Sequence, residues 1–212
     1  MALTNYTTLQ ASVKDWLKRS SATGVSTADL VPDFIAIGED EIFRRLRVRA
    51  MESAGTLTCV SGTAAVALPT RFKAFKWLYV AGNPVRKLEY ASGEQLYQTY
   101  SGSTNAKPFV FSYSGENLLL GPTPDSGYTL NYLAYIAPAA LSTSATNTLF
   151  PTYPTIYLYA ALKAAFNFLE QDSEVRKYEA LLTQAIELAQ KEDSMDRHSG
   201  STLRARAAVA GP

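Results

Sequence analysis

The sequence predicts an α+β protein, mainly a helical bundle with two N-terminal and two C-terminal helices, a β-rich insert and an extended C-terminal tail. Three observations predict this class. Apolar residues recur at helical spacing near both ends of the chain. The middle changes to short β-prone runs separated by glycine and proline turns. The end of the chain, RHSGSTLRARAAVAGP, carries only positive charge and has poor helix formers.

The first helix is predicted over Thr7–Arg19, with Asn5 or Thr7 as its N-cap. Its apolar stripe has the spacing i, i+4, i+7 and i+8: Leu9, Val13, Trp16 and Leu17.

The second helix is predicted to begin within a residue or two of Asp29, with Pro32 in its first turn, and to end near Val48. Gly38 lies within this helix, where glycine costs ~1 kcal/mol relative to alanine. We expect another helix to approach closely there, and the first helix is the expected neighbour. The predicted buried stripe is broad: Leu30, Phe34, Ile35, Ile37, Ile42 and Leu46.

The central insert is predicted to be strand-rich from Met51 to about Pro138. Ser92 and Gln95 form a capping box that opens a short helix ending near Tyr100. Three later runs, 109–113, 118–120 and 128–136, are predicted to form a three-stranded meander. In the last of them, alternate residues share one face: Tyr128, Leu130, Tyr132, Ala134 and Ile136.

Two more helices are predicted after a polar linker at Ser142–Thr148. The first spans about Pro154–Leu169, and the second runs from Asp172 or Ser173 to about Ser194. The second has a seam at 3-4-3-4 spacing: Val175, Tyr178, Leu182, Ala185 and Ala189. The predicted organisation is a helical core of residues 1–50 and 151–196, a β-rich insert at 51–150 with one short helix, and a C-terminal extension at 197–212.

The overall charge argues against a dedicated duplex-DNA binder. The chain has 20 Lys and Arg against 19 Asp and Glu, a net charge of +1, whereas phosphate neutralisation usually requires a strongly basic balance. The single cysteine, Cys59, excludes an intrachain disulfide and a metal site built on several thiolates. No apolar run approaches the ~20 residues of a membrane span, so we expect a soluble, reducing compartment and no cofactor.

No catalytic motif is present. Phosphate-binding loops, dinucleotide fingerprints and nucleophile elbows are all missing from the sequence. Cys59 and His198 are the one possible thiol–imidazole pair, and a small buried thiol is the favoured interpretation. Two groups of carboxylates, at 39–41 and 192–193, point apart on their helices and are interpreted as solvated helix faces.

The tyrosines offer one binding hypothesis. The chain has 13, and a stacking platform for bases or sugars could use six in the β-rich half: Tyr97, Tyr100, Tyr113, Tyr128, Tyr132 and Tyr135. Without interleaved basic residues, the favoured interpretation is half-buried strands and protein interfaces.

Four arginines are concentrated in six positions, at Arg44, Arg45, Arg47 and Arg49. The helix dipole and the pairs Asp40–Arg44 and Glu41–Arg45 account for two or three of them. In a monomer the cluster is a modest patch. In a ring of identical subunits it becomes a continuous basic band or a set of repeated intersubunit pairs.

Six segments in order carry a resemblance to a known family. They are YTTLQASVKDWLKR, DLVPDFIAIGEDEIFRRLRVRAME, LPTRFKAFKWLYVAGNPVRKLEY, LLLGPTPDSGYTLNYLAYIAPAALS, FPTYPTIYLYAALKAAFNFLEQDSEVRKYEALLTQAI and SGSTLRARA. Together they resemble the head-to-tail adaptor proteins of tailed bacteriophages, from about Tyr6 to Arg206.

The resemblance implies a non-enzymatic virion protein that forms a ring, usually of twelve copies, beneath the portal at the head-tail interface. Its implied partners are itself, the portal protein, a tail or nozzle protein, and genomic DNA passing through the lumen without sequence-specific binding; no membrane is involved. The family's portal-binding tail corresponds to Ser199–Arg206, and we expect Leu203, Arg204 and Arg206 to dock on the portal. The four clustered arginines are predicted at a subunit interface or the lumen wall.

Three alternatives remain open at this point. One is a completion or nozzle-proximal protein at another level of the tail. The second is a nucleic-acid-binding module, and the third a cell-wall-degrading virion enzyme, for which the sequence offers no paired acids.

Overall fold

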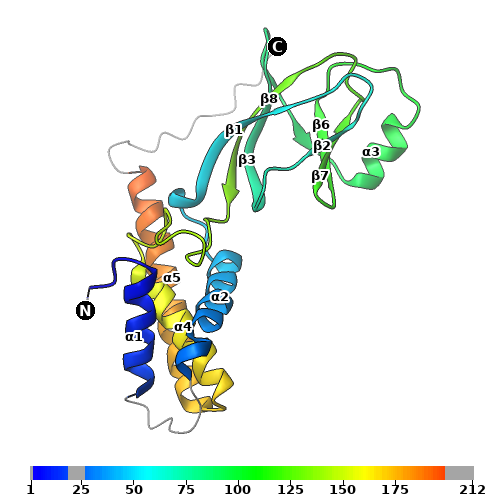
Figure 1. Ribbon diagram of the computed structural model, residues 1–212. Helices are drawn as coiled ribbons and strands as arrows, with labels where there is room; N and C mark the ends of the chain where they lie inside the picture. The colour runs from blue at the N-terminus through cyan, green and yellow to red at the C-terminus, as the bar shows by residue number, and fades with distance from the viewer. Residues whose placement is uncertain (1, 19–26, 199–212) are drawn as a thin grey trace. The chain divides into compact units, whose positions relative to one another are not determined.

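The computed structural model describes residues 2–18 and 27–198. Within them the predicted α+β class is confirmed, with five α-helices and two four-stranded sheets (Figure 1). The chain divides into two compact units. We call the described residues of Met1–Ala50 and Ala139–Pro212 the helical unit, and Met51–Pro138 the β unit.

Helix α1, Tyr6–Lys18, is capped by Asn5 as predicted. The Asn5 side-chain oxygen accepts a hydrogen bond from the Thr8 N–H at 2.9 Å, and the Thr8 hydroxyl accepts one from the Asn5 N–H at 3.0 Å. This reciprocal pair satisfies two donors at the helix start. Leu9, Val13 and Leu17 are buried as the stripe predicts, whereas Trp16 is 39% exposed at its edge.

Helix α2 covers Thr27–Arg45, so it begins within two residues of Asp29 as predicted but ends before the predicted Val48. Pro32 lies inside the helix, beyond its first turn. The helix ends before Leu46, because Leu46 and Val48 are both fully buried with exposed Arg47 between them. Residues two apart share a face only in an extended chain, so the backbone leaves the helix here and enters a short 3-10 helix, Arg49–Met51.

Helix α4, Pro154–Phe168, is the centre of the helical unit. It packs against α1, α2 and α5 and is buried on several sides, as its composition predicts. Gly38 of α2 faces α4, not α1 as predicted. A Cβ at Gly38 would lie 3.0 Å from the backbone of Ala160 and Ala161, so glycine permits the two helices to approach closely.

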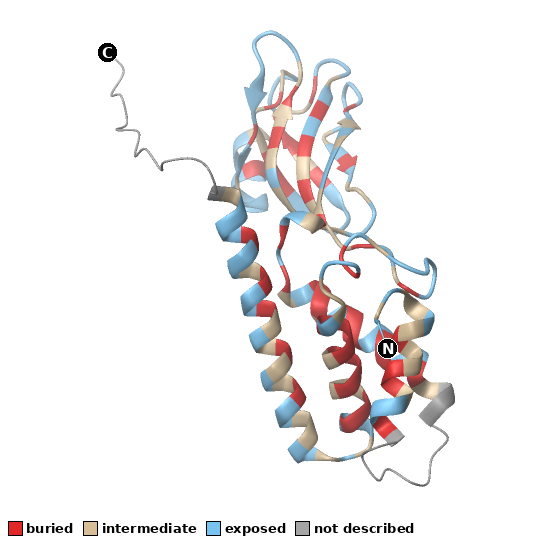
Figure 2. Ribbon diagram, turned by 90° about the vertical axis from the view of Figure 1, so that its left-hand side faces the viewer, coloured by how far each residue is buried: buried red, intermediate tan, exposed pale blue. Residues whose placement is uncertain are grey.

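Helix α5, Asp172–His198, is one turn longer than predicted. Its buried seam contains Tyr178, Leu182 and Ala189, with Ile186 more deeply buried than Ala185. Figure 2 shows buried residues along one side of this helix and exposed ones along the other. Arg197, assigned from sequence to the C-terminal extension, is helical and pairs with Asp193 at 2.8 Å.

The segment predicted as a polar linker, Ser142–Thr148, is anchored to the helical unit. The Asn147 side-chain oxygen accepts hydrogen bonds from the N–H groups of Leu149 and Phe150, at 3.1 and 2.9 Å. Leu149 and Phe150 are both fully buried. The Tyr6 N–H donates to the Ala145 carbonyl at 2.8 Å, which attaches the start of α1 to the same segment.

The β unit contains two antiparallel-rich sheets. One has the strand order β1-β8-β3-β4, with β1 Glu52–Thr58, β8 Thr129–Ile136, β3 Phe72–Val80 and β4 Arg86–Lys87. The other has the order β2-β7-β6-β5, with β2 Ala65–Ala67, β7 Asn117–Gly121, β6 Val110–Ser114 and β5 Glu89–Tyr90. Helix α3, Gly93–Tyr100, packs on β6 and β7 and has the predicted capping box between Ser92 and Gln95.

The predicted meander is wrong in its last strand. β6 and β7 form a hairpin, but β8 pairs with β1 and β3 in the other sheet. The connecting residues bond elsewhere: the Thr123 carbonyl accepts from the Ala106 N–H at 2.9 Å, and the Pro124 carbonyl from the Gly62 N–H at 2.8 Å. These bonds hold the chain as it crosses between sheets. Leu130, Tyr132 and Ala134 of β8 are buried on one face, as the alternation predicts.

Both sheets contribute to one apolar core. It contains Leu78, Val80, Leu130, Tyr132 and Ala134 from the first sheet, and Val66, Phe111, Leu118 and Leu120 from the second. Gly55 on β1 leaves room for the Tyr132 ring, since a Cβ there would lie 2.5 Å from the tyrosine hydroxyl. This packing fixes β1 against β8.

We predict that Gly38→Val destabilises the helical unit. A valine side chain would overlap the α4 backbone at Ala160 and Ala161, and overpacking of this kind costs ~1–3 kcal/mol. Exposed Ala36 on the same helix provides the control, because Ala36→Val costs only ~0.5 kcal/mol of helix propensity. Denaturant unfolding followed by circular dichroism measures both, and equal losses would show that the close contact is unimportant.

Candidate functional site

The four clustered arginines do not form one helical patch. Because α2 ends at Arg45, only Arg44 and Arg45 lie on it, while Arg47 is in the extended segment and Arg49 begins the 3-10 helix. The helix predicted to reach Val48 would have carried three of the four arginines, and that prediction is wrong at its C-terminal end. Each of the four has a different environment.

Arg45 is held inside the helical unit by an ion network. Its guanidinium contacts Glu41 at 2.9 Å and Glu179 at 2.8 Å, and donates to the Thr183 hydroxyl at 2.6 Å. Lys163 of α4 bridges the same two carboxylates, at 2.7 Å from Glu41 and 2.5 Å from Glu179. The network thus connects α2, α4 and α5 through two cations and two anions.

The charges of this network stabilise one another. Hydrogen bonding by Lys163 lowers the pKa of Glu179 against the opposing effect of burial. Burial alone would lower the pKa of Lys163, but its bonds with Glu179 and Glu41 raise it overall. Glu179 and Lys163 are therefore held in their charged forms.

The carboxylates predicted as solvated faces are mostly structural. Glu39 is only 4% exposed and accepts a hydrogen bond from the Leu141 N–H at 3.0 Å. Glu41 is half-buried in the network, which leaves Asp40 as the exposed member of its group. Asp193 is 8% exposed and accepts from the Arg49 N–H at 2.8 Å, while its neighbour Glu192 is exposed as predicted. The interpretation was wrong for three of the five.

Three arginines of the cluster are presented on the surface. The side chain of Arg44 is 78% exposed and 4.0 Å from Asp40, a separation at which a surface pair contributes little. Arg49 is 59% exposed and 3.9 Å from Asp196. Arg47 is exposed and donates to the Leu46 carbonyl at 3.2 Å. These three guanidinium groups are available to a partner, whereas Arg45 already has three partners of its own.

The β unit carries an aromatic cluster that the sequence analysis did not assemble. Phe72, Phe75, Tyr90, Phe111 and Tyr113 contact one another with ring-centre distances of 4.5–6.3 Å. Tyr90 is 63% and Tyr113 40% exposed. The rings come from three separate strands, so sequence spacing provided no signal for them.

A pocket of about 390 Å³ adjoins this cluster, lined by Phe75, Trp77, Tyr90 and Phe111 together with Lys76 and Lys87. Of the six tyrosines considered as a stacking platform, Tyr113 and buried Tyr132 contact Phe75, whereas Tyr100 packs on Phe109 and Tyr128 bonds to Asp125. The six do not form one platform.

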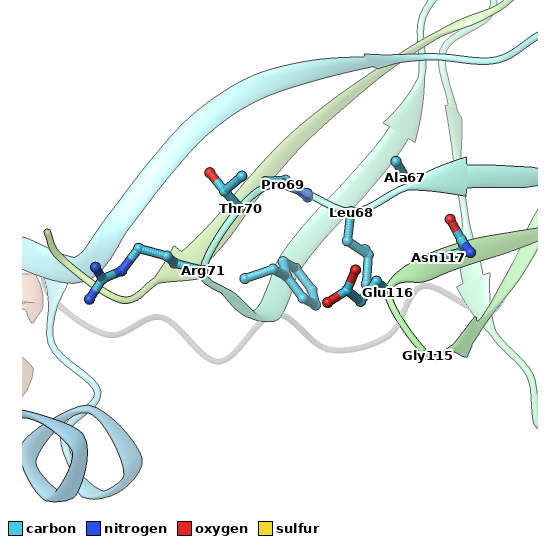
Figure 3. A pocket seen from close by; sticks show the side chains of 9 residues that line it. Ala67, Leu68, Pro69, Thr70, Arg71, Gly115, Glu116 and Asn117 are labelled. Atoms are coloured by element: carbon cyan, nitrogen blue, oxygen red, sulfur yellow. The ribbon is translucent and has the colours of Figure 1, made fainter.

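A second, open cleft of about 580 Å³ lies between the β2–β3 connection and the β6–β7 turn (Figure 3). Its ionisable side chains are Arg71 and Glu116. Figure 3 shows the Arg71 side chain directed away from Glu116. One arginine and one carboxylate that do not converge provide no acid–base pair for catalysis.

Cys59 lies in the core of the β unit, 1% exposed. Burial raises the pKa of its thiol to about 11, so it remains protonated and unreactive near neutral pH. The prediction of a small buried thiol is confirmed. Within residues 2–18 and 27–198, no three His, Cys, Asp or Glu side chains are grouped to hold a metal ion.

The predicted portal-docking residues Leu203, Arg204 and Arg206 lie outside the described residues. Lys163 and Glu179 were missed by the sequence analysis. Lys163 is the one ionisable side chain with a charge at neutral pH in the sequence PTIYLYAALKAAFNF of α4, and a single lysine in an apolar helix is a signal of a buried ion pair.

The helical unit packs around an ion network, and the β unit exposes aromatic rings of the kind that protein–protein interfaces use, which is typical of a partner-binding class of protein. The family model for the SU10 adaptor protein matches residues 4–206, and the chain belongs to that family. A comparison with curated proteins finds no match. No helix in the described part of the chain is long and apolar enough to cross a membrane.

The predicted family is therefore confirmed, since the SU10 adaptor family is a head-tail adaptor family of bacteriophages. The chain is a bacteriophage adaptor protein and a structural component of the virion. Membership in a structural family indicates a non-enzymatic role.

We predict that Glu179→Gln lowers the thermal stability of the helical unit in a pH-dependent way. The pKa of Glu179 is lowered on folding, so its contribution is present above its ordinary value of 4.5 and is lost as the pH falls through the folded-state value. At neutral pH we expect a loss of about 2–4 °C, equivalent to about 1 kcal/mol.

Melting curves of wild type and Glu179→Gln between neutral and acid pH measure this effect, and the two should converge in acid. Glu187→Gln, at an exposed position of the same helix, is the control. A difference that persists unchanged at acid pH would show that the carboxylate charge is not responsible.

Proposed function

We propose that this chain forms a closed ring beneath the portal, links the portal to the tail and lines the DNA exit channel. The observation that carries the proposal is the match of the adaptor family over residues 4–206, nearly the whole chain. Twelve copies are expected from the family resemblance. A closed ring requires two different complementary faces on each subunit.

The charge distribution supports this proposal. A net charge of +1 keeps copies from repelling one another around a ring and keeps the channel wall from holding DNA tightly. Arg44, Arg47 and Arg49 are exposed basic groups on the helical unit, and we propose that they lie at a subunit interface or on the lumen wall. Arg45 supports them by fixing the end of α2.

The C-terminal segment supplies the proposed portal contact through Leu203, Arg204 and Arg206. Such a contact is repeated in every copy of a ring, so many modest contacts add up. Genomic DNA passes through the lumen without sequence-specific binding in this scheme, and a tail or nozzle protein binds the ring from the other side.

We predict that the purified protein assembles into a ring when mixed with portal. Native mass measurement of the mixture should show a portal carrying an integral number of copies.

The triple substitution Arg44→Glu, Arg47→Glu and Arg49→Glu should prevent assembly or block DNA ejection from completed particles, because it reverses three exposed charges.

Reversal of Arg176 and Lys191, which are exposed on α5, is the matched control. Normal assembly and ejection by the triple variant would contradict the proposed role of Arg44, Arg47 and Arg49 at a subunit interface or the lumen wall. If the chain is instead a completion protein at another level of the tail, it should not associate with portal. If it is a nucleic-acid-binding module, the monomer should bind duplex DNA with a steep salt dependence.

We predict that truncation after His198 abolishes portal binding and leaves a folded protein. The cut follows the last residue of α5 and keeps the Asp193–Arg197 pair of that helix intact. Co-sedimentation with portal measures binding, and circular dichroism verifies the fold. Full-length protein carrying Leu203→Ala, Arg204→Ala and Arg206→Ala is the finer variant, and undiminished binding by both would contradict the assignment.

A further inference from the structure

Among the described residues, strand β1 has strand partners on only one side of its backbone. It is the end strand of the order β1-β8-β3-β4, and β8 is the strand paired with it there (Figure 1). The Cys59 N–H bonds to the Tyr128 carbonyl at 2.8 Å, which fixes the phase of the antiparallel ladder. Bonded and non-bonded pairs alternate along such a ladder, so Leu57, Gly55 and Ser53 face β8.

The N–H and C=O groups of Ala54, Thr56 and Thr58 consequently point away from β8. The hydrogen bonds between β8 and the end of β3 give the same result. Thr129 of β8 lies opposite Thr58, and its carbonyl accepts from the Ala81 N–H, so its backbone groups face β3 and not Thr58. None of these three residues of β1 has a hydrogen bond on its outer side within the described β unit.

The other sheet edges of the β unit are protected. β4 covers the outer side of β3 only at Tyr79 and Val80. The rest of β3 has two bulges, where the register shifts at Lys73 and at Lys76. Bulges and lysines are the devices by which proteins prevent strand addition. β2 has three residues, and β4 and β5 have two each.

β1 has none of these devices. Its seven residues, ESAGTLT, contain no proline and no lysine, and its pairing with β8 is continuous from Glu52 to Thr58. Glu52, its one charged residue, is paired with Lys76 at 2.9 Å. A regular seven-residue edge whose one charged side chain is already paired is complementary to another extended backbone.

We propose that the outer edge of β1 binds an extended segment of a tail protein by strand addition. This inference rests on the proposed ring. A second copy of this chain is the less suitable occupant, because pairing of β1 with β1 gives a two-fold dimer that does not extend into a ring, and the opposite edge at β3 is bulged.

The chemistry of the edge specifies the segment. The bound segment is expected to be uncharged and at least ~5 residues long, and to pair with the main-chain groups of Ala54, Thr56 and Thr58. On the core-facing side the added segment places an apolar side chain beside Leu57, which is only half-buried because no described strand flanks the outer side of β1. β-Branched residues suit this position.

The first test replaces Thr56 by proline in the full-length protein. Thr56→Pro removes one outward N–H, and proline is tolerated on an edge strand, particularly here because the preceding residue is Gly55. Thr56→Val keeps the N–H and is the matched control. We expect portal binding to be unchanged in both, and tail-bearing particles to fall about tenfold or more with proline, because the lost bond is repeated in every copy.

The second test does not depend on a substitution that affects the backbone. A photo-crosslinking amino acid is placed at Thr56 and, separately, at Thr58, and completed virions are irradiated. A crosslink to a tail protein supports the proposal; a crosslink to another copy of this chain, or none at either position, overturns it.

The two proposals fail in different ways. If the wild-type protein does not assemble on portal, the ring is wrong. If Thr56→Pro assembles on portal and attaches tails as well as Thr56→Val does, the ring stands and strand addition at β1 is wrong. If Thr56→Pro does not fold, the crosslinking result decides.

Discussion

The close contact of α2 with α4 at Gly38 governs the helical unit. Because Gly38 has no side chain, the backbone of α4 at Ala160 and Ala161 can lie against it. One turn further along each helix, Glu41 then reaches Lys163 at 2.7 Å, and Lys163 in turn reaches Glu179 on α5. Arg45 of α2 completes the ion network by pairing with both Glu41 and Glu179. A wider separation would leave Lys163 charged among apolar neighbours, and the desolvation penalty of that state is large unless the partners are in place.

This arrangement divides the arginine cluster between structure and recognition. Arg45 is used within the fold, where its half-buried ion pairs attach the last residue of α2 to Glu179 of α5. The turn out of the helix then separates Arg47 and Arg49 from it and leaves both exposed. The unit thereby presents basic groups on its surface while the whole chain stays near neutrality, at a net charge of +1. That combination suits the ring that we propose, in which each subunit would lie between copies of itself and beside DNA in transit.

Local signals in the sequence predicted local structure well. The N-cap at Asn5, the capping box of Ser92 with Gln95 and the burial of one face of β8 depend on residues within a few positions of one another. Four of the failures depend on distant residues. The partner of Gly38, the transfer of β8 to the other sheet, and the burial of Glu39 and Asp193 were decided by segments roughly 50 to 140 residues away, which one sequence does not pair. The candidate arginines were predicted only from their concentration in six positions of the sequence. The end of α2 among them was not predicted, because it depends on the burial of both Leu46 and Val48, two residues apart.

Edge protection explains why one strand of the β unit differs from the rest. An open edge is a hazard for a soluble subunit, because identical edges can pair and aggregate before assembly. β1 limits that hazard by composition: Ser, Ala, Gly and Thr offer little apolar surface, so a single strand addition is weak. Weak binding is a disadvantage for a monomer but not for a ring, where each copy adds its contact to an attachment already made by its neighbours. If β1 binds by strand addition as we propose, this edge favours multivalent partners, because an isolated strand dissociates readily whereas an oligomer that presents several segments at once is retained.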